Sequence, residues 1–381
     1  MKTKPIYSKQ LFPSPKEGLI LQKRRFGRTN LQVSIIGFGG TWISEISMEE
    51  ATKVVHTAFK LGINYFDTAK LDGDSEEKIG AALQNVRDKV VIATKTGSRT
   101  KRESLEDFKN SLHRLKTDRL DIIQLHGIDD EKTLRKAIAS DGALQTCKEA
   151  RAKGLVDFIG ITGHKPNVLV KAIKTNEFDT VLVPLNIITR QALEELLPTA
   201  KAYDIGVAAM KPLSAKTSKL VTCLYSPSLS LLSDEPELHV LLGEDKDAMV
   251  RTALRYVLAQ DVATVVTGLR TIHEVEIAAK TGEEYVKLTQ EEEQRFNFTL
   301  SREHCRDCGL CLPCPRGIDI AAVLRFYALY ENYGLKMWAK KLYSGLETKV
   351  DVCTKCGECE LKCPYHLPVM DKLQKAHVDM Q

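Results

Sequence analysis

The chain has 381 residues, of which 43% are hydrophobic and 28% are charged, with a formal net charge of +5. This composition is typical of a soluble globular core with an additional domain, and the small, dispersed charge does not indicate nucleic-acid binding. No stretch approaches the roughly 18 apolar residues of a membrane-spanning helix. The N-terminal segment MKTKPIYSKQLFPSPKEG lacks the apolar core of a signal peptide, so we expect a cytoplasmic protein.

Residues 1–21 are expected to form an N-terminal extension, and strand and helix patterns alternate over residues 22–285. Eight short runs rich in Val and Ile are apolar on both faces, as are the strands of a parallel sheet that is covered by helices. These runs lie at 33–40, 63–69, 90–95, 120–127, 157–162, 180–186, 206–212 and 263–269.

Segments of helical period separate these runs. Residues 48–62 and 189–204 are amphipathic, and Thr189 is placed to cap the second segment. Eight strands that alternate with helices predict an α/β fold of the (β/α)8 TIM-barrel type. A doubly wound sheet is disfavoured because the GFGG at 37–40 is not the phosphate turn G-x-G-x-x-G.

The stretch from Leu213 to Asp245 follows the seventh run and is much longer than a usual βα connection. In a barrel it would lie on the catalytic face. We interpret it as a lid or substrate loop, with a disordered insertion as the alternative.

Three of the runs end in residues that can carry chemistry. Asp67, Lys95 and His126 end the second, third and fourth runs. Because the C-terminal ends of barrel strands form one mouth, these side chains are expected to converge there and to make a proton-handling site. The alternative is that each is only a solvated strand end. His164 and Lys211 end further runs and are additional candidates.

Eight of the ten cysteines fall in two short blocks near the C-terminus. The second block matches the C-x2-C-x2-C-x3-C-P run that binds cubic 4Fe-4S clusters, and the first has x2 before its last cysteine. In such runs the proline-linked cysteine of one block completes the cluster of the other. We therefore predict one cluster on Cys305, Cys308, Cys311 and Cys363, and a second on Cys353, Cys356, Cys359 and Cys314.

Other uses of these cysteines fit less well. Zinc sites favour CxxC pairs separated by a dozen or more residues, and disulfides need an oxidising compartment; a single cluster is a further alternative. Helical periodicity between the blocks predicts that residues 286–381 form an all-α two-cluster ferredoxin domain. Outside the blocks, Cys147 is expected to be a small buried hydrophobic residue, and Cys223 a free thiol in a loop.

Several motifs together resemble the aldo-keto reductase family. They are RRFGRTNLQVSIIGFGGTW, INYFDTA followed by DSEEKIGAAL, VVIATK and LDIIQLHG, and the similarity covers roughly residues 23–280. The cysteine-rich tail is similar to that of a branch of this family with a two-cluster ferredoxin domain. The resemblance implies a TIM barrel, NADPH as hydride donor and an Asp-Tyr-Lys-His tetrad, in which Asp67, Lys95 and His126 match three members.

The fourth tetrad position differs from the family. Asp72 stands where the resemblance places the tyrosine, five residues after Asp67. Carbonyl reduction needs a donor that is protonated at neutral pH, which suits a phenol of pKa about 10 better than a free carboxyl of pKa about 3.9. We expect Asp72 to donate a proton if an apolar pocket raises its pKa, or to act as a base. Tyr65 lies too deep on its strand to substitute.

Positions that the resemblance assigns to the cofactor have also changed. Thr162-Gly163 replaces a Ser-Asn pair, Leu182 replaces a glutamine that holds the nicotinamide, and Ile277-Ala278 replaces a Glu-Asn pair near the adenine. Gly268 and Arg270 are retained, and the guanidinium suits a 2′-phosphate. The candidates for binding NADP(H) are therefore Thr162, Gly268, Arg270 and Lys211. Flavin also stays open, because barrels can bind it without a fixed motif.

The favoured function is an iron–sulfur oxidoreductase that acts on a small carbonyl or alcohol substrate and exchanges electrons with a redox partner protein through two clusters. Nicotinamide carries two electrons as hydride, whereas one cluster carries one. The clusters are thus relays or structural elements, or the barrel has abandoned nicotinamide. One alternative is a non-redox lyase or isomerase with structural clusters. Another is a non-catalytic electron carrier or redox sensor.

Overall fold

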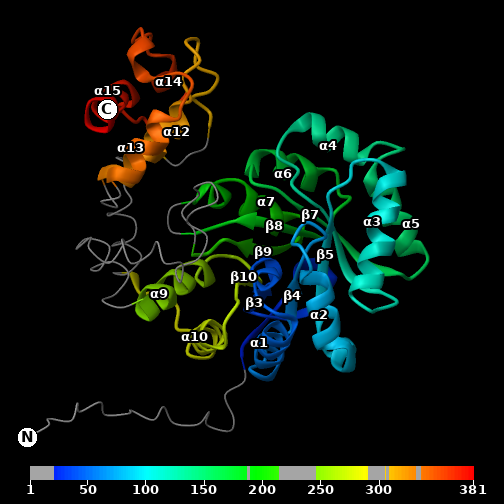
Figure 1. Cartoon of the computed structure of the whole chain (residues 1–381). Coiled ribbons are helices and arrows are strands. Elements are labelled where there is room, and N and C mark those ends of the chain that lie inside the picture. Colours follow the sequence, from blue (N-terminus) through cyan, green and yellow to red (C-terminus); the bar gives the residue numbers. More distant parts are fainter. Residues whose placement is uncertain (1–20, 187–188, 214–245, 291–304, 306–308, 332–335) are drawn as a thin grey trace, which may run out of the picture.

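The computed structural model describes residues 21–186, 189–213, 246–290, 305, 309–331 and 336–381. Eight parallel strands close into one barrel in chain order, and β10 pairs with β3. The strands span Ile36–Gly39 (β3), Tyr65–Asp67 (β4), Val91–Thr96 (β5), Leu120–Leu125 (β6), Val156–Thr162 (β7), Thr180–Pro184 (β8), Gly206–Met210 (β9) and Thr264–Gly268 (β10). The predicted TIM barrel is confirmed (Figure 1).

Helices surround the barrel on its outer side (Figure 1). They span Met48–Lys60 (α1), Ser75–Leu83 (α2), Lys101–Arg114 (α3), Glu131–Ile138 (α4), Ala143–Ala152 (α5), Pro166–Lys174 (α6), Leu196–Ala202 (α7), Lys246–Leu258 (α9) and Ile272–Glu283 (α10). Short 3-10 turns lie at Gly27–Thr29 (η1), Gly40–Glu45 (η2), Gln84–Lys89 (η3) and Gln191–Leu193 (η4). The predicted helix at 48–62 is confirmed, and Ser47 begins it with a capping box to Glu50.

The first predicted run is divided between two elements. Gln32–Ser34 forms β2, which pairs antiparallel with β1 (Lys23–Arg25), and only Ile36–Gly39 enters the barrel. Phe26, which follows β1, is fully buried, and its ring meets that of Tyr65 edge to face at 5.5 Å. The hairpin therefore closes the N-terminal end of the barrel, and Tyr65 packs at that end, away from the mouth.

The prediction that Thr189 caps a single helix over 189–204 is wrong. The segment forms η4 and then α7, and a residue other than Thr189 precedes each of them. Pro198 accounts for the break, because proline is tolerated in the first turn of a helix but removes a hydrogen bond in its interior. Thr189 instead donates its backbone N–H to the side-chain oxygen of Asn186 at 2.7 Å.

Two apolar layers stabilise the barrel. One fills its interior and includes Phe26, Tyr65, Ile122 and Leu182, and a larger one lies between the strands and the helices. Cys147 is 1% exposed within the outer layer, and burial raises the pKa of its thiol to about 12. The prediction of a buried hydrophobic cysteine is confirmed.

The C-terminal region is helical and has its own core. It contains α12 (Ile320–Glu331), α13 (Lys336–Ser344), η6 (Val350–Val352), α14 (Glu358–Leu361) and α15 (Val369–Met380). Phe326, Tyr327 and Tyr343 are buried in this core, and several cysteines pack against it. The helical character predicted between the cysteine blocks is confirmed.

Several predictions fall outside the described residues: the lid or substrate loop beyond Leu213, the free thiol of Cys223, and the cluster ligand Cys308. The boundaries 1–21, 22–285 and 286–381 stay predictions. Within the described part of the chain, no helix is long and apolar enough to cross a membrane.

Candidate active site and candidate cluster sites

The residues predicted from the strand ends lie at the C-terminal mouth of the barrel. Asp67 is the last residue of β4, Lys95 lies near the end of β5, and His126 directly follows β6. The Lys95 ammonium pairs with Oδ1 of Asp67 and donates to the carbonyl of Thr68 at 2.7 Å. Asp67 and Lys95 are only 6% and 5% exposed. Burial reduces the screening by water and strengthens their attraction.

Gln124 completes this pair and was not predicted from the sequence. It lies opposite Lys95 in the register of β5 and β6, and its Nε2 donates to Oδ2 of Asp67 at 2.9 Å. Gln124 could have been found from the alternation of side chains along a strand, since it precedes His126 by two residues and lies on the same side. A buried amide within an apolar run also needs a partner, which Asp67 provides.

Asp72 lies in the turn between β4 and α2, where its backbone N–H donates to the carbonyl of Ala69 at 2.9 Å. Its side chain is half-buried. Burial raises the pKa of the Asp72 carboxyl, the Lys95 ammonium opposes this effect and the Asp67 carboxylate adds to it, so that the pKa stays above its ordinary value. Asp72 thus shares the electrostatic environment of the Asp67–Lys95 pair.

His126 is a neutral imidazole near pH 7. Burial, together with the positive charges of Lys95 and Arg99, lowers the pKa of His126 to about 4. Arg99 fixes the strand end by donating to the carbonyl of His126 at 2.6 Å. Nδ1 of His126 is buried and has no hydrogen-bond partner among the described residues.

A second polar network lies close enough to His126 for His164 to influence its pKa. Nδ1 of His164, after β7, is 3.0 Å from Oδ2 of Asp129, and its Nε2 is 2.9 Å from Nζ of Lys211, after β9. A lysine ammonium can only donate, so Nε2 accepts from Lys211 and Nδ1–H donates to Asp129. Burial raises the pKa of Asp129, but the hydrogen bonds from His164 lower it to about 2. Sequence reasoning found His164 and Lys211 singly and missed Asp129.

The four residues predicted to bind a cofactor differ in their surroundings. Thr162 is buried at the end of β7, and Lys211 contacts His164. Gly268 lies under the indole of Trp42, which a Cβ at this position would overlap. The Arg270 guanidinium is 3.3 Å from a carboxylate oxygen of Glu45, so a 2′-phosphate would have to compete with this ion pair.

Leu182, which the resemblance places at the position of a nicotinamide-holding glutamine, is 1% exposed inside the barrel and offers no polar side-chain atom. Ile277 and Ala278 are buried on α10 and likewise offer none. At these positions, therefore, the side chains offer no polar atom to a nicotinamide or an adenine.

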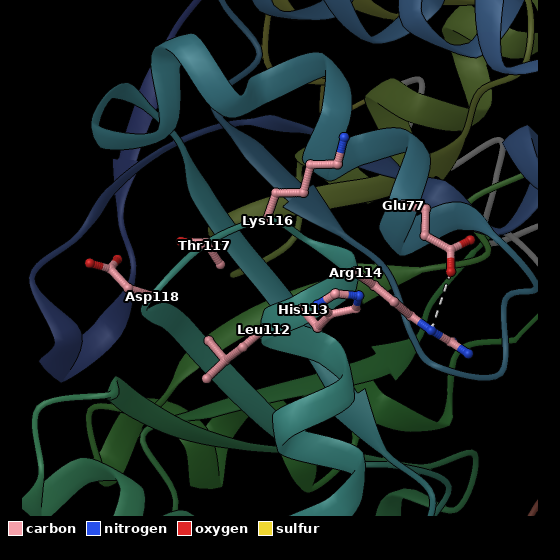
Figure 2. A pocket seen from close by; sticks show the side chains of 7 residues that line it. All are labelled: Glu77, Leu112, His113, Arg114, Lys116, Thr117 and Asp118. Carbon is pink, nitrogen blue, oxygen red and sulfur yellow. Dashed lines mark ion pairs between the residues drawn. The ribbon is translucent and has the colours of Figure 1, made fainter.

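A surface hollow is shown in Figure 2, and none of the residues discussed so far lines it. It lies where α3 leads into β6 and includes Lys116, Thr117 and Asp118, at the N-terminal end of that strand and so opposite the mouth. Arg114 and Glu77 form an ion pair of 3.4 Å at its rim. We assign this hollow no part in the active site.

A cavity in the C-terminal region is lined by cysteines. These are Cys314, Cys353, Cys356 and Cys359, which form one predicted ligand set, together with Cys311 from the other set. Ile318, Ile320 and Leu373 supply an apolar wall. Thiolate donors from both blocks around one partly apolar cavity suit a 4Fe-4S cube.

No group of three or more His, Cys, Asp or Glu side chains among the described residues is arranged to hold a single metal ion. Cys305 and Cys363 are partly buried against the same helical core. The assignment of individual cysteines to each cluster stays a prediction.

Comparison with protein families gives two matches. The model described as "Aldo/keto reductase family" matches residues 35–297, and the one described as "4Fe-4S dicluster domain" matches residues 304–368. The uncharacterized oxidoreductase YqkF of Bacillus subtilis is 30% identical over 281 residues, which are 67% of this chain and 89% of that protein. The L-galactose dehydrogenase of Arabidopsis thaliana is 29% identical over 312 residues, 71% of this chain and 92% of that protein.

Among solved structures, the holo form of the aldo-keto reductase AKR11C1 from Bacillus halodurans is similar to this chain. It has a TM-score of 0.61 and 28% sequence identity, and the similarity covers 73% of this chain and 96% of the other. The shared part is thus nearly the whole of that enzyme.

Proposed function

Because the chain belongs to the aldo/keto reductase family, we propose that it is an iron–sulfur oxidoreductase that interconverts a small alcohol and its carbonyl compound. The observation that carries this proposal is the buried Asp67–Lys95 pair at the barrel mouth, with Asp72 and His126 in its electrostatic environment. The cysteine-lined cavity supports the redox part. A one-electron carrier protein is the external partner.

Asp72 takes the place of the missing phenol as the group that moves the proton of the substrate oxygen. Its raised pKa makes it a better proton donor near neutral pH than a free carboxyl, and a better base when it is ionised. The Lys95 ammonium, held by Asp67 and Thr68, stabilises negative charge that develops on that oxygen. The neutral imidazole of His126 orients the oxygen by a hydrogen bond.

Oxidation of an alcohol to a carbonyl releases two electrons and two protons. When bound, each 4Fe-4S cluster takes up one electron. The carbon-bound hydrogen leaves as a hydride with both electrons, so a two-electron acceptor is needed between substrate and clusters. A bound flavin would supply it, because a flavin can take up a hydride and pass the electrons on one at a time. The proposed reaction does not use NADP(H), because the side chains of Leu182, Ile277 and Ala278 lack the polar atoms that the resemblance assigns to binding this cofactor.

Sugars are the first substrates to test. One relative is named L-galactose dehydrogenase and another D-threo-aldose 1-dehydrogenase. An aldose carries an oxidisable hydroxyl at its anomeric carbon and is small enough for a barrel mouth. The oxidised product is a lactone, and the chemistry at Asp72 is the removal of the hydroxyl proton.

The test begins with anaerobic purification and iron counting, for which about eight irons per chain are expected from two cubes. Sugar oxidation is then followed with a viologen-type or ferredoxin-type acceptor and, separately, with NADP+. We expect turnover with the one-electron acceptor. The Lys95→Met variant should keep its iron and lose activity, whereas Lys101→Met, which removes an exposed pair with Glu149, should keep both.

Two outcomes would contradict the proposal. Turnover with NADP+ alone, while the clusters stay in one redox state, would indicate an ordinary reductase with structural clusters. Turnover without any acceptor would favour the lyase or isomerase alternative.

A further inference from the structure

One cavity in the C-terminal region brings the two cysteine blocks together. Cys314 of the first block and Cys353, Cys356 and Cys359 of the second line it, with Cys311 beside them. Cluster ligands are thiolates, and reduction by one electron adds one more unit of negative charge to the cluster that they hold. The charged side chains around the cavity therefore affect how readily that electron is accepted.

Among the described residues, the charged side chains that line this cavity besides the cysteines are Arg316 and Glu358. Glu358 accepts from the Lys362 ammonium at 3.1 Å, so a positive charge already compensates it. No carboxylate in the described part of the chain lies within ion-pair distance of the Arg316 guanidinium. The wall of the cavity therefore keeps one positive charge that no neighbour neutralises.

The Arg316 side chain is held between the two cysteine blocks. Its Nε donates to the carbonyl of Val352 at 3.2 Å. Arg316 follows Cys314 by two residues, and Val352 directly precedes Cys353. The hydrogen bond thus joins the segment after a predicted ligand of the first block to the segment before one of the second, and it fixes the guanidinium beside the cavity.

A backbone amide adds to the positive potential at the same place. The N–H of Lys355 donates to Sγ of Cys353 at 3.4 Å. Lys355 makes this contact with a φ of 55°, in the left-handed region that residues other than glycine rarely adopt. Such strain persists where the surrounding structure requires it and is common at functional sites. Hydrogen bonds to the sulfurs are among the features that set the potential of a cluster.

From these contacts we infer that Arg316 raises the reduction potential of the cluster held in this cavity, because it keeps a positive charge against thiolate ligands. Reduction adds negative charge, which a fixed cation stabilises. Arg316 acts through the cluster and takes no part in proton transfer at the barrel mouth. The inference rests on the proposed function in one respect, that the cavity holds a redox-active 4Fe-4S cluster.

The test is a redox titration of the full chain, purified without air, loaded with iron and followed by electron paramagnetic resonance. Arg316→Gln removes the charge, and Arg316→Lys keeps it. Arg316 is exposed, so water and salt screen part of its effect. We expect Arg316→Gln to lower the ratio of reduced to oxidised cluster at a fixed solution potential by roughly threefold, which is about 28 mV for one electron. Arg316→Lys should titrate like the unmodified chain.

Two further variants serve as controls. Lys340→Gln removes an equal charge from α13, where Lys340 donates to the carbonyl of Gln381 at 2.6 Å and does not line the cavity, and it should change neither potential. Glu358→Gln leaves Lys362 without its partner and should move the potential in the opposite direction from Arg316→Gln. Both shifts should shrink at high ionic strength, because exposed charges are screened.

An unchanged potential in Arg316→Gln, or an equal shift in Lys340→Gln, would overturn the inference. So would a shift that Arg316→Lys does not restore or that salt does not reduce, since either result would assign the effect to packing. Iron counting on each variant separates a change in potential from the loss of a cluster. If Arg316→Gln loses its iron, an unchanged potential in Glu358→Gln would show that charges at this wall do not tune the cluster.

Failure of the proposed function would look different. An unmodified chain without a reducible cluster would contradict the proposed function itself. A normal, reducible cluster whose potential ignores Arg316 would overturn only the role inferred for this residue.

Discussion

At the scale of single residues, the proposed chemistry depends on the carboxyl of Asp72, which the sequence resemblance places at the position of the family's tyrosine. Asp72→Asn keeps the size of the side chain and removes the transferable proton. We expect kcat/KM to fall by roughly 10²–10⁴-fold, the usual contribution of a general acid or base. Iron content and the unfolding midpoint should not change.

The pH dependence of the rate in each direction tests this role of Asp72. Because burial raises the pKa of Asp72, carbonyl reduction needs its protonated form and should decline as pH rises through that pKa. Alcohol oxidation needs the ionised form and should rise over the same range. Rate profiles in both directions would show this limb in the wild type, and Asp72→Asn should lack it. A limb that persists in the variant would assign the proton transfer to another group.

His126 predicts an effect on stability. Its pKa is about 4 in the folded protein, against about 6.5 in the unfolded chain. Between these values the unfolded state binds more protons, so stability is complete above about pH 6.5 and is lost as the pH falls toward 4. The full shift corresponds to roughly 3 kcal/mol.

Urea denaturation at pH 7 and pH 4.5 measures this linkage. His126→Gln should flatten the dependence relative to the wild type, and His113→Gln, an exposed histidine at the other end of the barrel, should leave it unchanged. Equal slopes for the wild type and His126→Gln would show that His126 does not titrate differently in the folded state.

Some residues of the candidate site could be predicted from their position in the sequence, and others could not. Strand ends in a barrel share one mouth, so Asp67, Lys95 and His126 could be placed together before their contacts were known. Asp129 could not, because its link to His164 joins two loops whose paths are set by tertiary packing. The resemblance pointed to Arg270, but its pairing with Glu45 depends on the fold of a distant segment.

At the scale of elements, Lys78 holds η2 against α2 near the turn that carries Asp72. It is 3% exposed and donates to the carbonyls of Ile43 at 3.0 Å and Ile46 at 2.7 Å, and it pairs with Asp74 at 2.7 Å. Lys78→Met would remove the ammonium from the Ile43 and Ile46 carbonyls and break its ion pair with Asp74. We expect a loss of about 2–4 kcal/mol in the free energy of unfolding.

Chemical denaturation with Lys53→Met as control checks this expectation. Lys53 forms an exposed pair with Glu49 within α1, and its loss should change stability by less than about 0.5 kcal/mol. If both variants unfold at the same denaturant concentration, Lys78 does not hold the two elements together.

Hydrophobic periodicity predicted some secondary-structure elements correctly and others not. Apolar runs identified every barrel strand because strands buried on both faces leave little choice of pattern. The pattern could not show that residues 33–34 turn into a hairpin, since a strand outside the barrel is equally apolar when Phe26 and the barrel end cover it. The helix predicted over 189–204 also included Pro198, although proline disfavours a helix interior and this local effect could have been predicted from the sequence.

At the scale of the whole molecule, two separate cores have different sources of stability. The barrel has two extensive apolar layers. The C-terminal region has a smaller core, against which Cys305, Cys311, Cys314, Cys353 and Cys363 pack. Small domains with limited cores commonly depend on a metal. The clusters are therefore expected to be part of the fold of this region as well as redox centres.

Removal of the iron should accordingly unfold one part of the chain and spare the other. After oxidative destruction of the clusters and chelation, the thiols around the cavity lose the group that held them in place, and α12 and α15 lose the support beside them. Hydrogen exchange should show protection lost in 320–331 and 369–380 and kept in 120–125 and 156–162. Reconstitution with iron and sulfide should restore it. Loss of protection in the barrel strands as well would mean that the two cores fold as one unit, and protection kept in both helices would mean that the helical core is stable without its clusters.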